Sequence, residues 1–210
     1  MVILNQNEAQ FISKARFIFN CVFKELSLYT NAKVFLAGGA LSSLCTGRDV
    51  NDFDIFSDFP EQVCQYLKNM SEQNSSSFTS LYENDFVCNV SYSGKKIQVI
   101  KKHAFGNPQE IIDHFDFTVC SAVYDGQHLY AHDRFFLDNA QRRLVINNLP
   151  HPLSTFKRTY KYVSYGYAMC PVGMNTLIKA ITQLEIDFNN PTSNDLMFYP
   201  DGRLRFTGVD

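Results

Sequence analysis

The stretch VFLAGGALSSLCTGRDVNDFDIF, residues 34–56, decides the fold of this chain. Its first four residues are apolar and predict a short buried strand, which two glycines then interrupt. Residues 40–46 have the spacing of one or two helical turns, and residues 53–56 return as an apolar strand. The stretch therefore predicts a strand, a glycine turn, a short helix and a second strand.

Two aspartates lie at the start of the second strand. Because alternate residues of a strand point to the same face, Asp52 and Asp54 project together while Phe53 and Ile55 turn into the core. Burying a carboxylate without a partner is costly, so the pair indicates a bound cation or a tight hydrogen-bond network. Hard oxygen ligands of this kind select Mg²⁺ or Mn²⁺. An isolated Asp-x-Asp is more typical of a surface loop, and only its context favours a metal site.

The glycine turn supplies that context. Gly38 and Gly39 follow the first strand and open the short helix. With no side chains in the way, their backbone N–H groups and the positive end of the helix dipole can approach a phosphate closely. A tight turn that needs positive φ is the alternative explanation for adjacent glycines. Together with the two aspartates on the next strand, the turn predicts one cleft that holds phosphate and metal.

The composition predicts a globular protein. With 210 residues, 45% of them hydrophobic and 19% charged, the chain can form one sizeable core, with or without a small second lobe. No apolar run of about eighteen residues occurs, and the N-terminus lacks the basic start of a signal peptide, which predicts a cytoplasmic protein with no membrane partner. The six cysteines are widely spaced, which argues against a zinc site or a disulfide scaffold.

Charge is unevenly distributed along the chain. The formal net charge is −2, yet residues 139–184 contain six lysines and arginines and no aspartate or glutamate. An acidic part that holds metal beside a basic part that holds phosphate would produce this pattern. A basic face that is merely solvated is the alternative.

Apolar periodicity predicts the remaining elements. Residues 8–29 have the spacing of an N-terminal helix, with Asn7 available as its cap. From about residue 133 onward helical spacing dominates, and a polar tail with turn residues follows from residue 189. The other predicted elements are a helix over 60–70, a polar loop over 71–80, a hairpin of strands 86–92 and 96–101, a helix from residue 108, a central strand over 117–124 and a short strand over 127–130.

The order of these motifs resembles a known family. Gly38-Gly39, a helical turn, Gly47-Arg48 and residues 52–55 match the signature of the DNA polymerase β-type nucleotidyltransferase superfamily. The closest likeness is to the head and neck of tRNA CCA-adding enzymes and bacterial poly(A) polymerases, and small phage and viral proteins have a similar arrangement. Asp116-Phe117-Thr118-Val119 resembles the second motif of that family, and the basic residues from Arg142 to Lys161 are similar to its neck helices.

The resemblance implies a fold and an activity. The fold class is α+β, a nucleotidyltransferase core over residues 1–131 with a mixed β-sheet and flanking helices, followed by a helical C-terminal lobe and tail over 132–210. The implied activity is Mg²⁺- or Mn²⁺-dependent transfer of a nucleoside monophosphate from a nucleoside triphosphate, ATP or CTP, to an acceptor hydroxyl. An RNA 3′ end, including that of tRNA, is the favoured acceptor.

The site residues are carried over position by position. The predicted catalytic residues are Asp52, Asp54 and Asp116, of which Asp52 and Asp54 hold the metal. For Asp116, a contact to the sugar or a structural hydrogen bond is an equal alternative. The predicted nucleotide-binding residues are Gly38, Gly39, Ser42, Arg48, Thr118, Arg158 and Lys161.

The sequence departs from the family pattern in three places. Ser42-Ser43 stands where CCA-adding enzymes usually carry Arg-Asp, and Phe115 stands where they usually carry arginine. Gln98 stands where some relatives carry an acid. These departures support two rival hypotheses. One is a degenerate relative that binds a nucleotide or a protein without catalysis, and the other is a toxin-like enzyme that nucleotidylates a protein hydroxyl.

Overall fold

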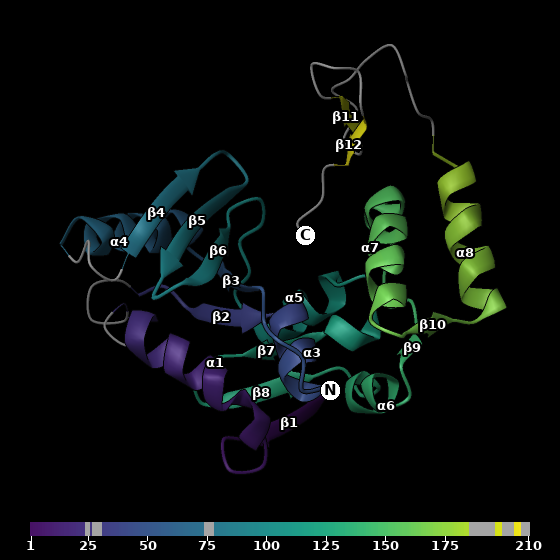
Figure 1. The fold of residues 1–210 in the computed structure, drawn as a ribbon, viewed down its shortest axis with the longest axis horizontal. Helices are drawn as coiled ribbons and strands as arrows, with labels where there is room; N and C mark the ends of the chain where they lie inside the picture. The colour runs from purple at the N-terminus through teal and green to yellow at the C-terminus, as the bar shows by residue number, and fades with distance from the viewer. Residues whose placement is uncertain (24–25, 27–30, 74–77, 185–195, 199–203, 207–210) are drawn as a thin grey trace.

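A mixed eight-stranded sheet forms the centre of the computed structural model, which describes residues 1–23, 26, 31–73, 78–184, 196–198 and 204–206 (Figure 1). Its strand order is β1-β8-β7-β2-β3-β6-β5-β4, in which β3 and β6 are parallel and the other neighbouring pairs are antiparallel. The strands are β1 (Val2–Asn5), β2 (Val34–Ala37), β3 (Asp52–Ser57), β4 (Phe78–Glu83), β5 (Val87–Tyr92), β6 (Lys95–Ile100), β7 (Ala122–Tyr124) and β8 (His128–Ala131). The predicted α+β class with a mixed sheet is confirmed.

Helices cover both faces of this sheet and continue into the C-terminal part of the chain (Figure 1). The helices are η1 (Gln10–Ile12), α1 (Ser13–Ile18), η2 (Phe19–Phe23), α3 (Gly39–Cys45), α4 (Pro60–Gln73), α5 (Pro108–His114), η3 (Thr118–Cys120), α6 (Phe135–Ala140), α7 (Pro152–Ser164) and α8 (Pro171–Thr182). Two short strand pairs complete the described elements: β9 (Arg143–Leu144) with β10 (Ala168–Met169), and β11 (Leu196–Phe198) with β12 (Leu204–Phe206).

Alternation along β3 separates the core from the site. Phe53 and Ile55 are buried in the large core that α1, α3 and α4 share with one face of the sheet. Phe56 belongs to the smaller core on the opposite face, where α5 contributes Ile111 and Ile112. Asp52 and Asp54, four and two residues before Phe56, therefore lie on the α5 side of the sheet.

Strand register places the glycine turn beside the aspartates. Ala37, the last residue of β2, pairs with Asp54, so the chain leaves β2 for Gly38 next to that carboxylate. On the other side of β3, Asp52 pairs with Lys96 and Asp54 pairs with Gln98. The middle of the sheet thus positions the candidate site.

The N-terminal helix differs from its prediction. Instead of one helix over 8–29, the chain forms the edge strand β1, a 3₁₀ turn, α1 and the π-helical turn η2; residues 24–25 and 27–30 lie outside the described residues. Asn7 is not the cap, because the Asn5 side chain accepts the backbone N–H groups of Asn7 and Glu8 at 2.9 and 3.2 Å. The pairing of β1 with β8 fixes Asn5 at that turn.

Two further predictions need correction. A polar loop was predicted over 71–80. The helix α4 includes residues 71–73 and the strand β4 includes residues 78–80, while residues 74–77 lie outside the described residues. Phe78 begins β4 because its ring is buried against Tyr92, with 5.0 Å between the ring centroids. A strand was predicted over 117–124, but only its last three residues form the strand β7, because Thr118–Cys120 form the turn η3.

The C-terminal part is helical, as predicted, but α6 is short. Arg142 has φ of 53°, which ends the helical path before β9. Because α6 packs against α3 and η3, elements on both sides of residue 131 share contacts, and the predicted division there stays a prediction. Much of the predicted tail, residues 185–195, 199–203 and 207–210, lies outside the described residues. No helix in the described part of the chain is long and apolar enough to span a bilayer.

A histidine pair at the end of α5 predicts an acid-sensitive contribution to stability. The rings of His103 and His114 lie 4.7 Å apart, and burial together with the charges of His103, His151, Lys102 and Arg158 lowers the pKa of His114 to about 4. This pKa lies below the ordinary 6.5, so the folded protein favours neutral His114. The stability that this neutral form contributes is complete above pH 6.5 and is lost as pH falls toward 4. We expect the free energy of unfolding, measured in urea between pH 4 and 8, to fall less steeply on the acid side in His114→Gln.

The control is Gln109→Ala, which changes an exposed, non-titrating side chain on the same helix α5 and should leave the shape of the pH profile unchanged. An unchanged acid limb in His114→Gln would contradict the prediction.

Candidate active site

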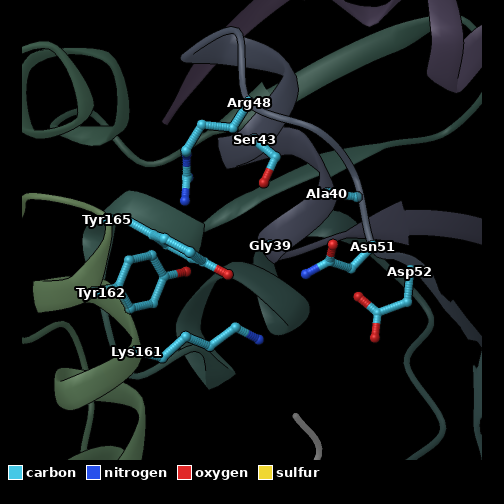
Figure 2. Close-up of a pocket in the computed structure, with 9 residues that line it drawn as sticks. All are labelled: Gly39, Ala40, Ser43, Arg48, Asn51, Asp52, Lys161, Tyr162 and Tyr165. Carbon is cyan, nitrogen blue, oxygen red and sulfur yellow. The ribbon is translucent and has the colours of Figure 1, made fainter.

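A cleft opens between α3 and the start of β3 on one side and α7 on the other (Figure 2). Figure 2 shows the ammonium group of Lys161 and the carboxylate of Asp52 extending into this space from opposite walls. The cleft is lined by Gly39, Ala40, Ser43, Arg48, Asn51, Asp52, Lys161, Tyr162 and Tyr165.

The two aspartates and the two glycines lie together. Asp54 Oδ2 is 3.8 Å from the point that a Cβ on Gly38 would occupy. Asp52 lines the same cleft as Gly39, with its side chain 23% exposed and its Oδ2 3.7 Å from Lys96 Nζ. The structure thus brings together the four residues that the sequence predicts to face one cleft, while their chemical roles stay predictions.

Asp54 is the most perturbed acid of this site. Burial, and then the neighbouring charge of Asp52, raise its pKa to about 8, although Lys161, Lys96 and Arg158 act in the opposite direction. Its Oδ1 is buried and has no hydrogen-bond partner in the described part of the chain. A buried carboxylate oxygen without a donor is costly unless a ligand supplies one, so this atom fits a hard cation.

The donor set fits Mg²⁺ only in combination with a substrate. Among the described residues, no group of three or more His, Cys, Asp or Glu side chains could hold a metal ion by itself. Mg²⁺ is commonly bound through one or two carboxylates and the phosphates of a substrate, and Asp52 and Asp54 match that pattern. Gln98, the neighbour of Asp54 on β6, is buried and neutral, so it adds no third carboxylate.

Gly38 is required by the backbone. Its φ is +82°, and its N–H donates to the carbonyl of Ala122 at 3.2 Å. A Cβ at this position would lie 3.1 Å from the ring of Phe115, the residue that replaces the family's arginine. The positive-φ turn weighed in the sequence therefore accounts for Gly38, whereas Gly39 lines the cleft.

This geometry predicts a graded effect of alanine at two glycines. Gly47 also has positive φ, +69°, but nothing lies within 4 Å of its Cβ position. We expect Gly47→Ala to lower the free energy of unfolding by about 1 kcal/mol through the left-handed conformation alone. Gly38→Ala should lose about 2–3 kcal/mol, because φ of 82° with ψ of −138° lies outside the left-handed helical region and because the methyl group also crowds the ring of Phe115. Chemical denaturation of both variants measures this, and equal losses would contradict the predicted clash.

Ser42 does not face the cleft. Its side chain is fully buried, and its hydroxyl donates to Asn139 Oδ1 at 2.9 Å and accepts from Arg48 Nη2 at 3.1 Å. Ser42 therefore joins α3 to α6 and cannot reach a phosphate in this arrangement. Ser43, one residue and about 100° further around the helix, lines the cleft in its place.

Arg48 lines the cleft and packs against two aromatic rings. Its Nε donates to Thr46 Oγ1 at 2.9 Å, and its guanidinium carbon lies 4.5 Å from the ring centroid of Tyr165 and 5.5 Å from that of Tyr167. Cation–π contacts of this kind hold the guanidinium at the edge of the cleft. Tyr165 was missed in the sequence, although its place one turn after Lys161 on a predicted helix was a signal for it.

Asp116 and Arg158 bind each other. Asp116 is 3% exposed, and its Oδ2 accepts a hydrogen bond from Arg158 Nη1 in an ion pair. This ion pair matches the structural alternative for Asp116 and engages the guanidinium of Arg158 within the protein, while the chemical roles of both residues stay predictions. Thr118 is also engaged, because its hydroxyl donates to Asp138 Oδ2 at 2.7 Å.

Sequence comparison links the chain to phage proteins. The family model described as "Gabija anti-defense 2 family protein" matches residues 9–142. The protein named Gabija anti-defense 2 from Bacillus phage SPbetaL7 is 27% identical over 140 residues, which cover 65% of this chain and 34% of that protein. The chain thus spans about a third of the length of this curated relative.

Solved structures of CCA-adding enzymes have the same fold. The Thermotoga maritima CCA-adding enzyme complexed with tRNA matches 87% of this chain and 46% of its own, with a TM-score of 0.64 and 16% identity. The Bacillus stearothermophilus CCA-adding enzyme in complex with CTP matches 80% of this chain and 42% of its own, with a TM-score of 0.55 and 18% identity. The predicted nucleotidyltransferase fold, with the head and neck of CCA-adding enzymes, is confirmed.

Proposed function

The chain belongs to the Gabija anti-defense 2 family, and from that premise we propose that it is a phage anti-defense protein that transfers a nucleoside monophosphate from a nucleoside triphosphate to an acceptor hydroxyl. An RNA 3′ end is the favoured acceptor. The observation that carries the proposal is the buried Oδ1 of Asp54, which has no hydrogen-bond partner among the described residues and lies on the same strand face as Asp52, a residue of the cleft. A carboxylate in that state is poised for a cation that arrives with a triphosphate.

The residues around the cleft suit the parts of a nucleotide. Lys161 and Arg48 line it and supply positive charge for phosphates. Tyr165, which carries Arg48 on its ring, offers an aromatic surface to a base. Asp52 and Asp54 would hold Mg²⁺ or Mn²⁺, which when bound neutralises phosphate charge and favours ionisation of the attacking hydroxyl.

The proposed reaction is a single displacement at phosphorus. The acceptor oxygen forms a bond to the α-phosphorus, and the bond between that phosphorus and the oxygen bridging to the β-phosphate breaks. Pyrophosphate leaves, and the hydroxyl proton passes to solvent water. Lys161 lies where it can bind the phosphates throughout this exchange.

Labelled triphosphates test the proposal. The protein is incubated with Mg²⁺ and each α-labelled triphosphate in a cell extract, and RNA, protein and small molecules are then separated. We expect label in RNA. Label in protein would instead support the toxin-like alternative, and label in none of the three fractions would refute transfer.

Binding without transfer is the second candidate function. Neutral Gln98 beside Asp54, and the engagement of Asp116 by Arg158, leave Asp52 and Asp54 as the two carboxylates that the described residues offer to a metal ion here. Calorimetric titration with Mg²⁺ and each triphosphate separates the candidates. Binding without release of pyrophosphate, across RNA and protein acceptors, would favour this second function, and turnover would eliminate it.

A further inference from the structure

The amphipathic pattern of α7 is inverted. Its buried residues are mostly small or hydroxylated: Pro152, Ser154, Thr155, Thr159 and Tyr162. Large apolar side chains remain on its outer surface, where Phe156 is 51% exposed, Tyr160 81% and Val163 52%. A helix normally buries its large apolar side chains. Exposed rings gathered on one helix therefore indicate a surface that binds something.

A repeat within α7 indicates what that surface binds. Phe156-Lys157 and Tyr160-Lys161 are the same aromatic–lysine pair, repeated after four residues. Because residues four apart share a helix face, the two rings form one row and the two lysines form the row beside it. Both rows advance by about 6 Å along the axis. We call these four residues the α7 platform.

The platform is continuous with the cleft. Lys161 lines the cleft and extends into it opposite Asp52 (Figure 2), whereas Lys157 and Phe156 lie one turn toward the start of the helix. Residues 139–184 contain no acid, and two of their six lysines and arginines, Lys157 and Lys161, lie on this platform and supply positive charge for a polyanion. A protein partner would explain the rings but not the parallel row of lysines.

We propose that the α7 platform binds the single-stranded 3′ end of an RNA acceptor. Two successive bases stack on Tyr160 and Phe156, and Lys161 and Lys157 face the phosphates that join them. The terminal nucleotide lies at the Lys161 end, from which its hydroxyl can enter the cleft. The inference deepens the proposed function and rests on it for the direction of the strand, whereas binding itself needs no catalysis.

Equilibrium binding tests the platform without nucleotide or Mg²⁺. The affinity of the whole chain for a fluorescently labelled, unstructured oligoribonucleotide is measured by anisotropy. We expect Tyr160→Ala to weaken binding about tenfold and Tyr160→Phe to leave it nearly unchanged, because stacking needs only the ring. Tyr160 is 81% exposed, so its removal leaves no cavity. Val172→Ala, at a 74% exposed position on α8, is the matched control and should bind as the wild type does.

Salt dependence tests the lysine row. Lys157→Gln should reduce the slope of log affinity against log salt by about 0.7, the value for one contact to a single strand. Affinity for a duplex of the same sequence should be much weaker than for the single strand, because paired bases cannot stack on the rings.

Three results would overturn the proposal for the α7 platform. The first is wild-type RNA affinity in both Tyr160→Ala and Phe156→Ala, and the second is equal affinity for the single strand and the duplex. The third is a sedimentation mass, measured without RNA, that is lower for Tyr160→Ala than for the wild type, because this would assign the surface to a second copy of the chain. Calorimetry with Mg²⁺ and ATP separates the two proposals. A wild type that binds RNA through Tyr160 but binds no triphosphate would retain the platform and refute the proposed function.

Discussion

Replacing Asp54 with asparagine should abolish nucleotidyl transfer, with a loss of about a thousandfold or more. The substitution keeps the size of the side chain but removes the charge that would hold the metal ion, and metal ions supply several kcal/mol of transition-state stabilisation. Asp52→Asn should have the same effect, because both side chains lie on one face of β3, with Asp52 lining the cleft and Asp54 beside Gly38. The measurement is release of pyrophosphate, or transfer of α-label, by each purified variant.

Folding must be checked separately, and the electrostatics of Asp54 make that check informative. Because its pKa is raised to about 8 in the folded protein, the ionised form is disfavoured, and its contribution to stability falls as pH rises from about 4 to about 8. Asp54→Asn should therefore unfold no more easily than the metal-free wild type at pH 8. Asp49→Asn, at an exposed position just before the site, is the control and should keep full activity. Retained transfer in either Asp52→Asn or Asp54→Asn would refute the assignment.

Local periodicity explains which parts of the site could be predicted. Alternate residues of any strand lie on one face, so the spacing of Asp52 and Asp54 was enough to predict that they lie together. The face on which a helical side chain lies is harder to predict, since each residue along a helix turns the side-chain direction by about 100°. Ser42 was therefore predicted at the cleft, where the structure has Ser43.

Pairs that are distant in sequence could not be predicted. Asp116 and Arg158 are 42 residues apart, and each alone resembles a functional residue of the family. Only the packing of η3 and its neighbours against α7 shows that the two charges satisfy each other. The edge strand β4 was missed for a related reason, because its residues gain their order from pairing with β5.

Replacing Arg158 with alanine should chiefly destabilise the fold. The variant leaves the nearly buried Asp116 carboxylate without its partner, and breaking a buried ion pair in this way costs about 3–5 kcal/mol. In thermal unfolding, a chain of this size should lose roughly 6–20 °C in Tm. The double variant Asp116→Asn with Arg158→Met should recover much of that loss, because it removes both charges and keeps most of the volume.

The comparison with Lys161 distinguishes this structural role from phosphate binding. Lys161 is exposed and lines the cleft, so Lys161→Ala should weaken binding of ATP with Mg²⁺ while moving Tm little. If Arg158 acted on phosphates instead, Arg158→Ala would weaken nucleotide binding at an unchanged Tm, and the double variant would restore nothing. The two basic residues lie three apart on one helix. Opposite outcomes for them would therefore show that their surroundings assign their roles: the Asp116 carboxylate for Arg158, and the cleft shared with Asp52 for Lys161.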